Sequence, residues 1–392
     1  MVLRINFPHV KHLGASVSFL ALTASLVACG GTPTSSTSPA SGSSPAGSPA
    51  AGASPAGSPA AGTVSFKGKT TVTGAGASFP ATIYQRWFQD LTKKVPQLEV
   101  NYQSVGSGAG IEQYTKGTVD FGASDTGMKD EEIAKVPADK GVMLLPMTAG
   151  SIVMAYNVEG IDTGLKLSRE VYVGILLGEI TKWNDPKIMA ANPGAKLPDQ
   201  AITVVYRSDG SGTTGVFTKH LAAISPDWKT KVGEGRTVQW LAGVGAKGNE
   251  GVTAQIQQTP GAIGYVEYGY AKTNNLKWAA LENKAKEFVL PTPEASSKTL
   301  AAVKLPENFR AFVEDPEGPG VYPLVTYTWL LVPKKIADPE KAKAMEVLIE
   351  YGLNEGQKVA DSLGFVPLPQ TVREKVAAAA DTLSPDYKIT IK

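Results

Sequence analysis

A seven-residue turn places the strongest constraint on this chain: Arg207-Ser208-Asp209-Gly210-Ser211-Gly212-Thr213. It follows an apolar, β-branched run at residues 202–206 and precedes a run at 216–221 with the pattern of an amphipathic helix. The first backbone N–H groups of a helix have no partner inside the helix, and the helix dipole places partial positive charge there. The glycines also let the backbone approach a ligand closely. A strand, a glycine turn and a helix start therefore predict an anion site, although a simple capped turn has the same pattern.

The side chains of this turn favour an oxyanion as the ligand. Ser211 and Thr213 offer hydroxyl donors, and Arg207 offers a planar cation that suits an oxyanion. Gly212 lies between the two hydroxyl residues and offers a backbone N–H group. Asp209 would repel an anion, so we expect its carboxylate to hold Arg207 in place instead.

The composition leaves few residues for covalent or metal chemistry. The 392-residue chain has one cysteine and three histidines, and only His220 lies beyond the first dozen residues. A histidine-based triad, a Cys/His pair and a His/Cys zinc site all lack their parts, so we expect no cofactor and no metal. The net charge of +2 comes from Arg4 and Lys11, which leaves no basic field to attract nucleic acid. We expect His220 to be a surface or packing residue.

The first 63 residues carry signals of targeting rather than of folding. Residues 1–28 have a basic start and an apolar run too short to span a bilayer, as a secretory signal peptide does. Small residues precede Cys29, which resembles the lipobox of bacterial lipoproteins and implies acylation at Cys29; a plain signal peptide with an incidental cysteine is the alternative. Residues 29–63 are nearly all Ser, Pro, Ala, Gly and Thr and cannot bury a core, so they predict a disordered tether.

A repeated strand, small-residue turn and helix indicate α/β architecture from residue 70 onward. In the first repeat, Ser78 predicts a helix cap and Pro80 a position in the first helical turn. Ile83, Trp87 and Leu91 give that helix an apolar stripe. The other elements expected before residue 140 are strands at 70–73, 98–102 and 119–125, and helices at 111–116 and 129–136.

A second α/β region follows residue 150, as the length of the chain also suggests. The apolar stretch at 142–156 is broken by Pro146 and Gly150, and it predicts either two strands or one strand that crosses between domains. Residues 322–332 are apolar and β-rich and are suited to return the chain from the second α/β region to the first. The remaining predicted elements are helices at 168–177, 249–258, 339–353 and 371–380 and a strand with a turn at 261–267.

Four motifs in order and at matching spacing carry a resemblance to a known family. They are Gly-Ala-Gly-Ala-Ser-Phe-Pro at 74–80, Val-Asp-Phe-Gly-Ala-Ser-Asp at 119–125, the turn at 207–213, and Pro-Gly-Ala-Ile-Gly-Tyr-Val-Glu-Tyr at 260–268. Together with Lys-Gly-Asn-Glu-Gly at 247–251, they resemble the substrate-binding proteins of bacterial high-affinity phosphate ABC transporters. The similarity runs from about Thr70 to the C-terminal region.

The resemblance implies an α/β, two-lobed periplasmic binding protein fold of type II, with two crossover strands between the lobes. We expect lobe 1 at residues 64–150 plus 322–392 and lobe 2 at residues 151–321. The implied function is that of an extracytoplasmic receptor, monomeric and held on a membrane through Cys29. Such a receptor would capture inorganic phosphate and deliver it to the permease subunits of an ABC transporter.

Carried over to matching positions, the resemblance implies contacts between phosphate and residues of both lobes. Ser107, and Ser78 where the family often has threonine, would donate from helix starts in one lobe. Arg207 would pair with the anion, and Asp125 would accept a proton from it. The implied contact residues are Ser78, Phe79, Ser107, Asp125, Arg207, Ser211, Gly212 and Thr213, with Asp209 as the support of the arginine.

The role implied for Asp125 has a physical basis. Near neutral pH phosphate keeps at least one P–OH group, whereas sulfate is fully ionised and only accepts hydrogen bonds. A buried carboxylate therefore gains a hydrogen bond from phosphate and faces only lone pairs of sulfate. Sites built around a ligand's hydroxyl reject analogues that lack it by roughly four to five powers of ten.

Two other functions remain compatible with parts of the sequence. Asp209-Gly-Ser-Gly212 superficially resembles the turn of a serine nucleophile, but neither Ser107 nor Ser211 fits the Gly-x-Ser-x-Gly elbow. A phosphatase would normally use a dense cluster of metal ligands, and the sequence has none, so an enzyme is disfavoured. A related receptor that senses phosphate or binds another oxyanion fits the sequence as well.

Overall fold

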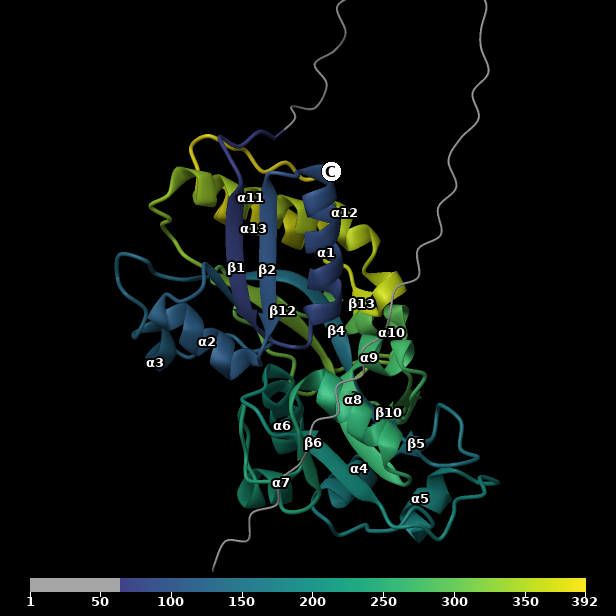
Figure 1. Cartoon of the computed structure of the whole chain (residues 1–392). Helices are drawn as coiled ribbons and strands as arrows, with labels where there is room; N and C mark the ends of the chain where they lie inside the picture. The colour runs from purple at the N-terminus through teal and green to yellow at the C-terminus, as the bar shows by residue number, and fades with distance from the viewer. Residues whose placement is uncertain (1–63) are drawn as a thin grey trace, which may run out of the picture. The chain divides into compact units, whose positions relative to one another are not determined.

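The computed structural model describes residues 64–392, and a mixed ten-stranded sheet runs through them in the order β2-β1-β3-β12-β4-β8-β6-β7 (Figure 1). Strands β13 and β9 also pair with β4, and a separate three-stranded sheet has the order β11-β10-β5. The α/β prediction is confirmed by this architecture. The predicted signal peptide at 1–28, the lipidated Cys29 and the tether at 29–63 lie outside the described residues.

Helices and strands alternate along most of the described chain. The strands are β1 (Thr70–Gly76), β2 (Leu98–Ser104), β3 (Phe121–Ser124), β4 (Met143–Tyr156), β5 (Lys166–Leu167), β6 (Thr203–Arg207), β7 (Val244–Ala246), β8 (Ala262–Glu267), β9 (Lys277–Trp278), β10 (Ala280–Glu282), β11 (Phe288–Val289), β12 (Val325–Val332) and β13 (Phe365–Val366). The helices are α1 (Ala81–Lys94), α2 (Ser107–Lys116), α3 (Asp130–Ile133), α4 (Arg169–Leu176), α5 (Pro186–Ala191), α6 (Gly212–Ile224), α7 (Pro226–Lys231), α8 (Gly248–Gln258), α9 (Tyr268–Thr273), α10 (Pro293–Ala301), α11 (Pro339–Leu353), α12 (Glu355–Lys358), α13 (Gln370–Ala380) and the 3-10 helix η1 (Asp361–Leu363).

The long strand β4 joins two groups of elements, which we call lobe 1 and lobe 2. Its first part pairs with β12 and its last part, from Ile152, pairs with β8. Lobe 1 comprises β1–β3, α1–α3, β13 and α11–α13; lobe 2 comprises β5–β11 and α4–α10 (Figure 1). The sequence left open whether residues 142–156 form one strand or two, and they form one. Pro146, which has no N–H to donate, lies where the register against β12 shifts, so a bulge absorbs it.

In lobe 1 the parallel strands β1, β2 and β3 are covered by helices on their two faces. The apolar stripe predicted for α1 is confirmed, because Ile83, Trp87 and Leu91 are all buried. The indole N–H of Trp87 donates to the carbonyl of Gly356 at 2.9 Å, which ties α1 to the C-terminal helices.

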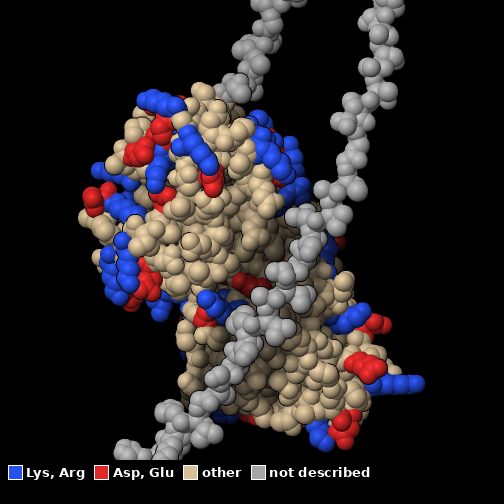
Figure 2. Space-filling view, in the orientation of Figure 1, with Lys and Arg blue, Asp and Glu red and all other residues tan. Residues whose placement is uncertain are grey.

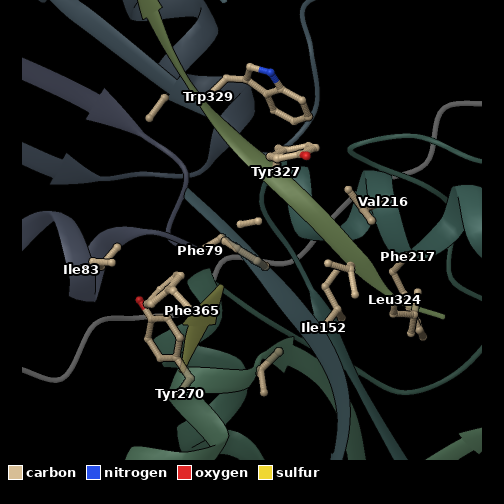
Figure 3. Packing of buried hydrophobic residues seen from close by; sticks show 14 of the residues in the cluster. Phe79, Ile83, Ile152, Val216, Phe217, Tyr270, Leu324, Tyr327, Trp329 and Phe365 are labelled. Atoms are coloured by element: carbon tan, nitrogen blue, oxygen red, sulfur yellow. The ribbon is translucent and has the colours of Figure 1, made fainter. Parts of the chain in front are cut away.

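Lobe 2 is built around β6, which lies between β8 and β7 and runs parallel to both. Helix α6 packs against this sheet, with the ring of Phe217 stacked on that of Tyr265 at 4.5 Å between centroids. The apolar core continues from one lobe to the other: Figure 3 shows Ile83 and Trp329 on the lobe 1 side, Ile152 on β4, and Phe217 on α6.

Three local predictions need correction. Ser78 does not cap α1, because the helix begins at Ala81 with Pro80 at its N-cap position and no side-chain cap. The helix predicted at 129–136 covers only Asp130–Ile133, since Pro137 follows closely and disfavours helical geometry before it. The helix predicted from residue 111 begins earlier, at Ser107.

The predicted helices at 168–177, 249–258, 339–353 and 371–380 are confirmed to within a residue or two. Among residues 64–392, no helix is long and apolar enough to cross a membrane. On the face shown in Figure 2, Lys and Arg lie interspersed with Asp and Glu rather than forming a field of one sign.

Candidate oxyanion-binding site

The starts of α2 and α6 meet where the two lobes touch. The backbone N–H of Gly108 donates to the carbonyl of Gly210 at 2.7 Å across this contact. A methyl group added to Gly212 would lie 2.4 Å from the Ser107 hydroxyl oxygen and 2.8 Å from the Asp125 backbone nitrogen. Only a glycine at position 212 therefore lets the lobes approach this closely.

Several buried N–H groups at these helix starts have no acceptor among residues 64–392. They belong to residues at the first positions of α2 and α6 and just before α1, and each of these residues is buried. A buried N–H group without a partner is costly, so these groups indicate that an acceptor from outside the chain belongs here. The residues are Phe79, Ser107, Gly212 and Thr213.

The serine hydroxyls at the helix starts are oriented by the backbone. Ser211 is the N-cap of α6, and its hydroxyl oxygen accepts from the N–H of Thr214 at 3.0 Å. The hydroxyl oxygen of Ser107 accepts from the N–H of Asp125 at 3.3 Å. Because a hydroxyl group has one proton and two lone pairs, both groups keep their proton for an additional acceptor.

Arg207 and Asp209 form a bidentate ion pair at the carboxyl end of β6. Asp209 accepts from Arg207 Nε at 2.7 Å and from Nη2 at 2.6 Å. Burial acts to lower the pKa of Arg207, but the hydrogen bonds and charge of Asp209 outweigh it and raise that pKa. The Asp209 carboxylate also accepts from the Gly248 N–H at 3.0 Å. The guanidinium is thus held as a fixed, buried cation at the site.

Asp125 is the buried acceptor of the site and lies just beyond the carboxyl end of β3. One carboxylate oxygen accepts from the Thr328 hydroxyl at 2.9 Å, and the other accepts from the Thr213 hydroxyl at 3.4 Å. Burial raises the pKa of Asp125 to about 7, against the opposing effects of Thr328 and Arg207. The carboxyl can therefore exchange a proton near neutral pH, which suits it to recognise a ligand that carries a hydroxyl.

Five of the nine predicted residues are joined by hydrogen bonds into one network, namely Ser107, Asp125, Arg207, Asp209 and Thr213. Gly212 lies against Ser107 and Asp125, and the Ser211 hydroxyl accepts from Thr214 of its own helix. Arg207 Nη1 donates to the Thr213 hydroxyl at 3.4 Å, which links the cation to Asp125. Ser78 reaches Thr213 only through Asn249, whose amide nitrogen is 2.9 Å from the Ser78 hydroxyl and 3.3 Å from that of Thr213. The Phe79 ring packs edge-on against Phe365 (Figure 3), so only its backbone is available to a ligand.

The sequence analysis missed two residues of the network, Asn249 and Thr328. Asn249 lies within the motif at 247–251, and its place at the start of α8 after a glycine is a signal of the same kind as the other helix starts. Thr328 lies inside the apolar strand β12, where no local pattern marks it. Its position beside Asp125 depends on the pairing of β12 with β3 and β4.

No group of three or more His, Cys, Asp and Glu side chains is placed to hold a metal ion in the part of the chain that the structure describes. His220 is buried in lobe 2, between the Tyr172 hydroxyl at 2.9 Å and the carbonyl of Glu314 at 2.7 Å. Its role is packing, one of the two expected for it. The site itself offers hydrogen-bond donors, one fixed cation and one proton acceptor.

Two lobes around a buried cluster of donors define the class of solute-binding proteins. A family model described as a PBP superfamily domain matches residues 43–355. The chain belongs to this superfamily and, by its close relatives, to the PstS family. The two-lobed fold predicted from the sequence is thereby confirmed.

The family assignment rests on relatives of similar sequence, and solved structures share the fold. The phosphate-binding protein PstS of Pasteurella multocida is 43% identical over 311 residues, which cover 79% of this chain and 89% of that protein. Phosphate-binding protein PstS 2 of Mycobacterium tuberculosis is 33% identical, and the matched region covers 95% of this chain and 98% of that protein. The structure of a phosphate-binding protein from Stenotrophomonas maltophilia has a TM-score of 0.65 at 20% identity, covers 79% of this chain and 93% of its own, and shows the fold alone.

Proposed function

We propose that the chain captures inorganic phosphate between its two lobes and delivers it to the permease of an ABC transporter. The observation that carries this proposal is the position of Asp125, a buried acceptor with a pKa of about 7, among hydrogen-bond donors and the Arg207 cation. Such a set matches an anion that still carries a proton. The names of the PstS relatives, which are phosphate-binding proteins, support the same ligand.

The proposed ligand contacts come from both lobes. Ser78 and Ser107 donate hydroxyl protons from lobe 1, and the Phe79 and Ser107 backbones donate N–H groups. Asp125 accepts the proton of the phosphate. From lobe 2, Arg207 supplies the charge with Asp209 as its support, and Ser211, Gly212 and Thr213 donate from the start of α6. The N–H groups without acceptors support the roles of Phe79, Gly212 and Thr213, and the oriented hydroxyls support those of Ser107 and Ser211.

Capture proceeds by closure of the lobes, because a ligand that contacts both lobes stabilises the closed state over the open one. Contacts that join the two lobes support this mechanism, because separating the lobes would break them. One is the bond from Gly108 to Gly210, and another is the ion pair of Arg236 in lobe 2 with Glu132 on α3. We also propose the lobe limits of 64–150 plus 322–392 and 151–321, which place the division within β4 near the change of partner at Ile152.

The site of action and the anchor are parts of the same proposal. Acylation at Cys29 would hold the protein on the outer side of a membrane, next to the permease subunits, and a monomer is sufficient for this role. Metabolic labelling with a radioactive fatty acid tests the anchor. The wild-type chain should be labelled and sediment with membranes, whereas Cys29→Ser should be unlabelled; equal labelling of both would contradict the anchor.

Two alternatives are distinguishable by experiment. A sensing receptor would bind phosphate equally well but would not be needed for phosphate uptake, so cells lacking the gene would import phosphate at the normal rate. A serine hydrolase or phosphatase would cleave a chromogenic phosphate ester. We propose no such activity, because the only histidine of the described residues is buried at a distance from the site and engaged with Tyr172 and Glu314.

Isothermal titration with phosphate and with sulfate tests the proposed function. The full chain carrying Cys29→Ser, stripped of bound phosphate, should bind one phosphate tightly at neutral pH and respond little to sulfate. A folded, stripped chain that binds sulfate or another oxyanion better than phosphate would overturn the assignment of the ligand.

A further inference from the structure

Asn249 forms a bridge between the lobes at the bottom of the proposed site. It lies at the second position of α8 in lobe 2 and is fully buried. Its backbone N–H donates to the Ser78 hydroxyl of lobe 1 at 3.0 Å, and its side-chain nitrogen donates to the same oxygen at 2.9 Å. The same side-chain nitrogen lies 3.3 Å from the Thr213 hydroxyl oxygen. One amide thus touches a proposed ligand contact from each lobe.

The orientation of this amide is fixed by a neighbour that can only donate. The backbone N–H of Glu267 donates to Asn249 Oδ1 at 2.8 Å. Because an N–H group cannot accept, the atom that faces it must be the amide oxygen. The amide nitrogen must therefore face the two hydroxyls, and the alternative orientation with oxygen and nitrogen exchanged is excluded.

This arrangement decides what the hydroxyl of Ser78 can do. A hydroxyl oxygen has two lone pairs and one proton. Both lone pairs of Ser78 are directed at N–H groups of Asn249, one from the backbone and one from the side chain. The proton of Ser78 is the group that remains, so this hydroxyl can meet a further partner only as a donor.

The hydroxyl of Thr213 is also held by Asn249, but its one proton already has an acceptor, so of the two hydroxyls only that of Ser78 keeps a proton for the anion. The Thr213 oxygen accepts from Asn249 at 3.3 Å and from Arg207 Nη1 at 3.4 Å, and its proton is directed toward Asp125. An oxyanion in the site presents lone pairs and needs donors. A hydroxyl that was free to rotate would lose part of its interaction with the anion, because ordering it costs entropy and its lone pairs would repel the ligand.

We propose that Asn249 is a positioning residue that makes the hydroxyl of Ser78 an obligate donor toward the bound anion and holds the hydroxyl of Thr213 with its proton on Asp125. The proposal rests on the proposed function, because it concerns the same site. Asn249 acts through the two hydroxyls, and its contribution exists only when the lobes are closed and Ser78 lies against α8.

The support of Asn249 comes from the elements around it. Gly248, with φ of +72°, turns the chain into α8 and donates its N–H to Asp209. Asp209 in turn holds Arg207, so the helix that presents the amide is tied to the ion pair of the site. The Thr253 hydroxyl donates to the Asn249 carbonyl at 2.8 Å and steadies the first turn of the helix.

The test compares Asn249→Ala and Asn249→Asp with the wild-type chain by phosphate titration and stopped-flow release. Alanine removes the donor, so phosphate affinity should fall by about 10-fold to 100-fold, mainly through faster release. Aspartate keeps the shape and the bond to Glu267 but offers an acceptor to both hydroxyls, so it should weaken phosphate binding more than alanine does. Asn249→Asp binding as tightly as wild type would overturn the proposal.

A mutant cycle separates positioning from a purely structural effect. In a chain that carries Ser78→Ala and Thr213→Val, the hydroxyls are gone, and adding Asn249→Ala should change phosphate affinity by less than about twofold. If Asn249→Ala lowers phosphate affinity as much in this double variant as in wild type, Asn249 acts through the general structure and the proposal is overturned.

The matched control is Asn157→Ala. The Asn157 side chain donates to the carbonyls of Ile256 and Gln257 at the other end of the same helix, away from the site. It should lower stability in urea without changing phosphate release. If the wild-type chain itself fails to bind phosphate, the proposed function is wrong and this proposal falls with it; if wild type binds and Asn249→Ala binds equally, only this proposal is wrong.

Discussion

The two faces of the site differ in how the sequence builds them. The face from lobe 2 comes mainly from one continuous turn, in which Arg207, Asp209, Ser211 and Thr213 lie within seven residues. The face from lobe 1 is assembled from three separate places, at the starts of α1 and α2 and at the end of β3. The first face is specified locally, whereas the second requires the whole sheet of lobe 1 to form.

The two faces also differ in chemistry. Lobe 2 supplies the fixed cation and the donors of α6, and lobe 1 supplies the one proton acceptor, Asp125, beside further donors. From this difference we expect lobe 2 to provide most of the affinity for an anion and lobe 1 to provide the selectivity between anions. The following predictions test that expectation, beginning with the largest expected effect.

Asp125→Asn should reduce the preference for phosphate over sulfate by as much as about four powers of ten. The amide offers a donor where the carboxylate only accepts, so the penalty against a fully ionised anion disappears. Titration with both anions measures the ratio. Asp120→Asn, a half-buried neighbour in lobe 1 that bonds to Thr73 and Lys341, is the control and should leave the ratio unchanged. Unaltered selectivity in Asp125→Asn would refute the role of lobe 1 as selector.

The same carboxyl predicts a pH dependence for sulfate. Burial raises the pKa of Asp125 to about 7, so the group gains its proton as the pH falls through that value and can then donate to sulfate. Sulfate affinity should rise by up to about tenfold per pH unit as the pH falls from about 9 toward 7 in wild type, and it should level off below about pH 7. It should stay flat over this range in Asp125→Asn, and a parallel rise in that variant would point to another group.

Arg207→Gln should weaken phosphate binding by roughly a thousandfold, since it removes the cation and leaves Asp209 uncompensated beside the anion. The loss should be similar for sulfate, because lobe 2 provides affinity rather than choice. Arg169→Gln breaks another bidentate pair of lobe 2, with Asp315, and should reduce stability in urea without reducing affinity. A loss of affinity for phosphate but not for sulfate would contradict the view that lobe 2 provides affinity and lobe 1 selectivity.

His220 should make lobe 2 the more acid-sensitive half. Burial lowers its pKa to about 4, below the value of about 6.5 in the unfolded chain. Its contribution to stability is thus present above about pH 6.5 and is lost as the pH falls toward 4, by on the order of 3 kcal/mol. Hydrogen exchange at pH 5 should accelerate in α6 more than in α1, and urea unfolding of His220→Gln should show a weaker pH slope. Equal slopes would exclude this residue as the cause.

The smallest effect concerns the contact between the lobes at their rim. Glu132→Gln removes the ion pair with Arg236, which also donates to the Thr126 hydroxyl at 3.1 Å. Because a partly exposed pair contributes little, phosphate release should accelerate only about threefold to fivefold, with association unchanged. Glu131→Gln, an exposed neighbour on the same helix, is the control. A slower association in Glu132→Gln would indicate steering of the ligand rather than closure.

The sequence by itself determined the features that depend on near neighbours. Helix α11 covers the predicted residues because Asp338 caps it and Pro339 suits its first turn. The Arg207–Asp209 pair and the Ser211 cap arise within one turn, where residue types and spacing define the contacts. The α/β class followed from the repeated strand, turn and helix, and the family followed from four motifs in order.

Only the tertiary structure decided the features that join distant residues. Ser78 suggested a local cap, but its hydroxyl bonds to Asn249, 171 positions further along the chain. Thr328 bonds to Asp125 because β12 returns beside β3, and no pattern in an apolar strand indicates that. The raised pKa of Asp125 likewise comes from burial, which the sequence around it does not specify. Local patterns encode backbone geometry and available donors, whereas burial and pairing across the sheet assign each donor its partner.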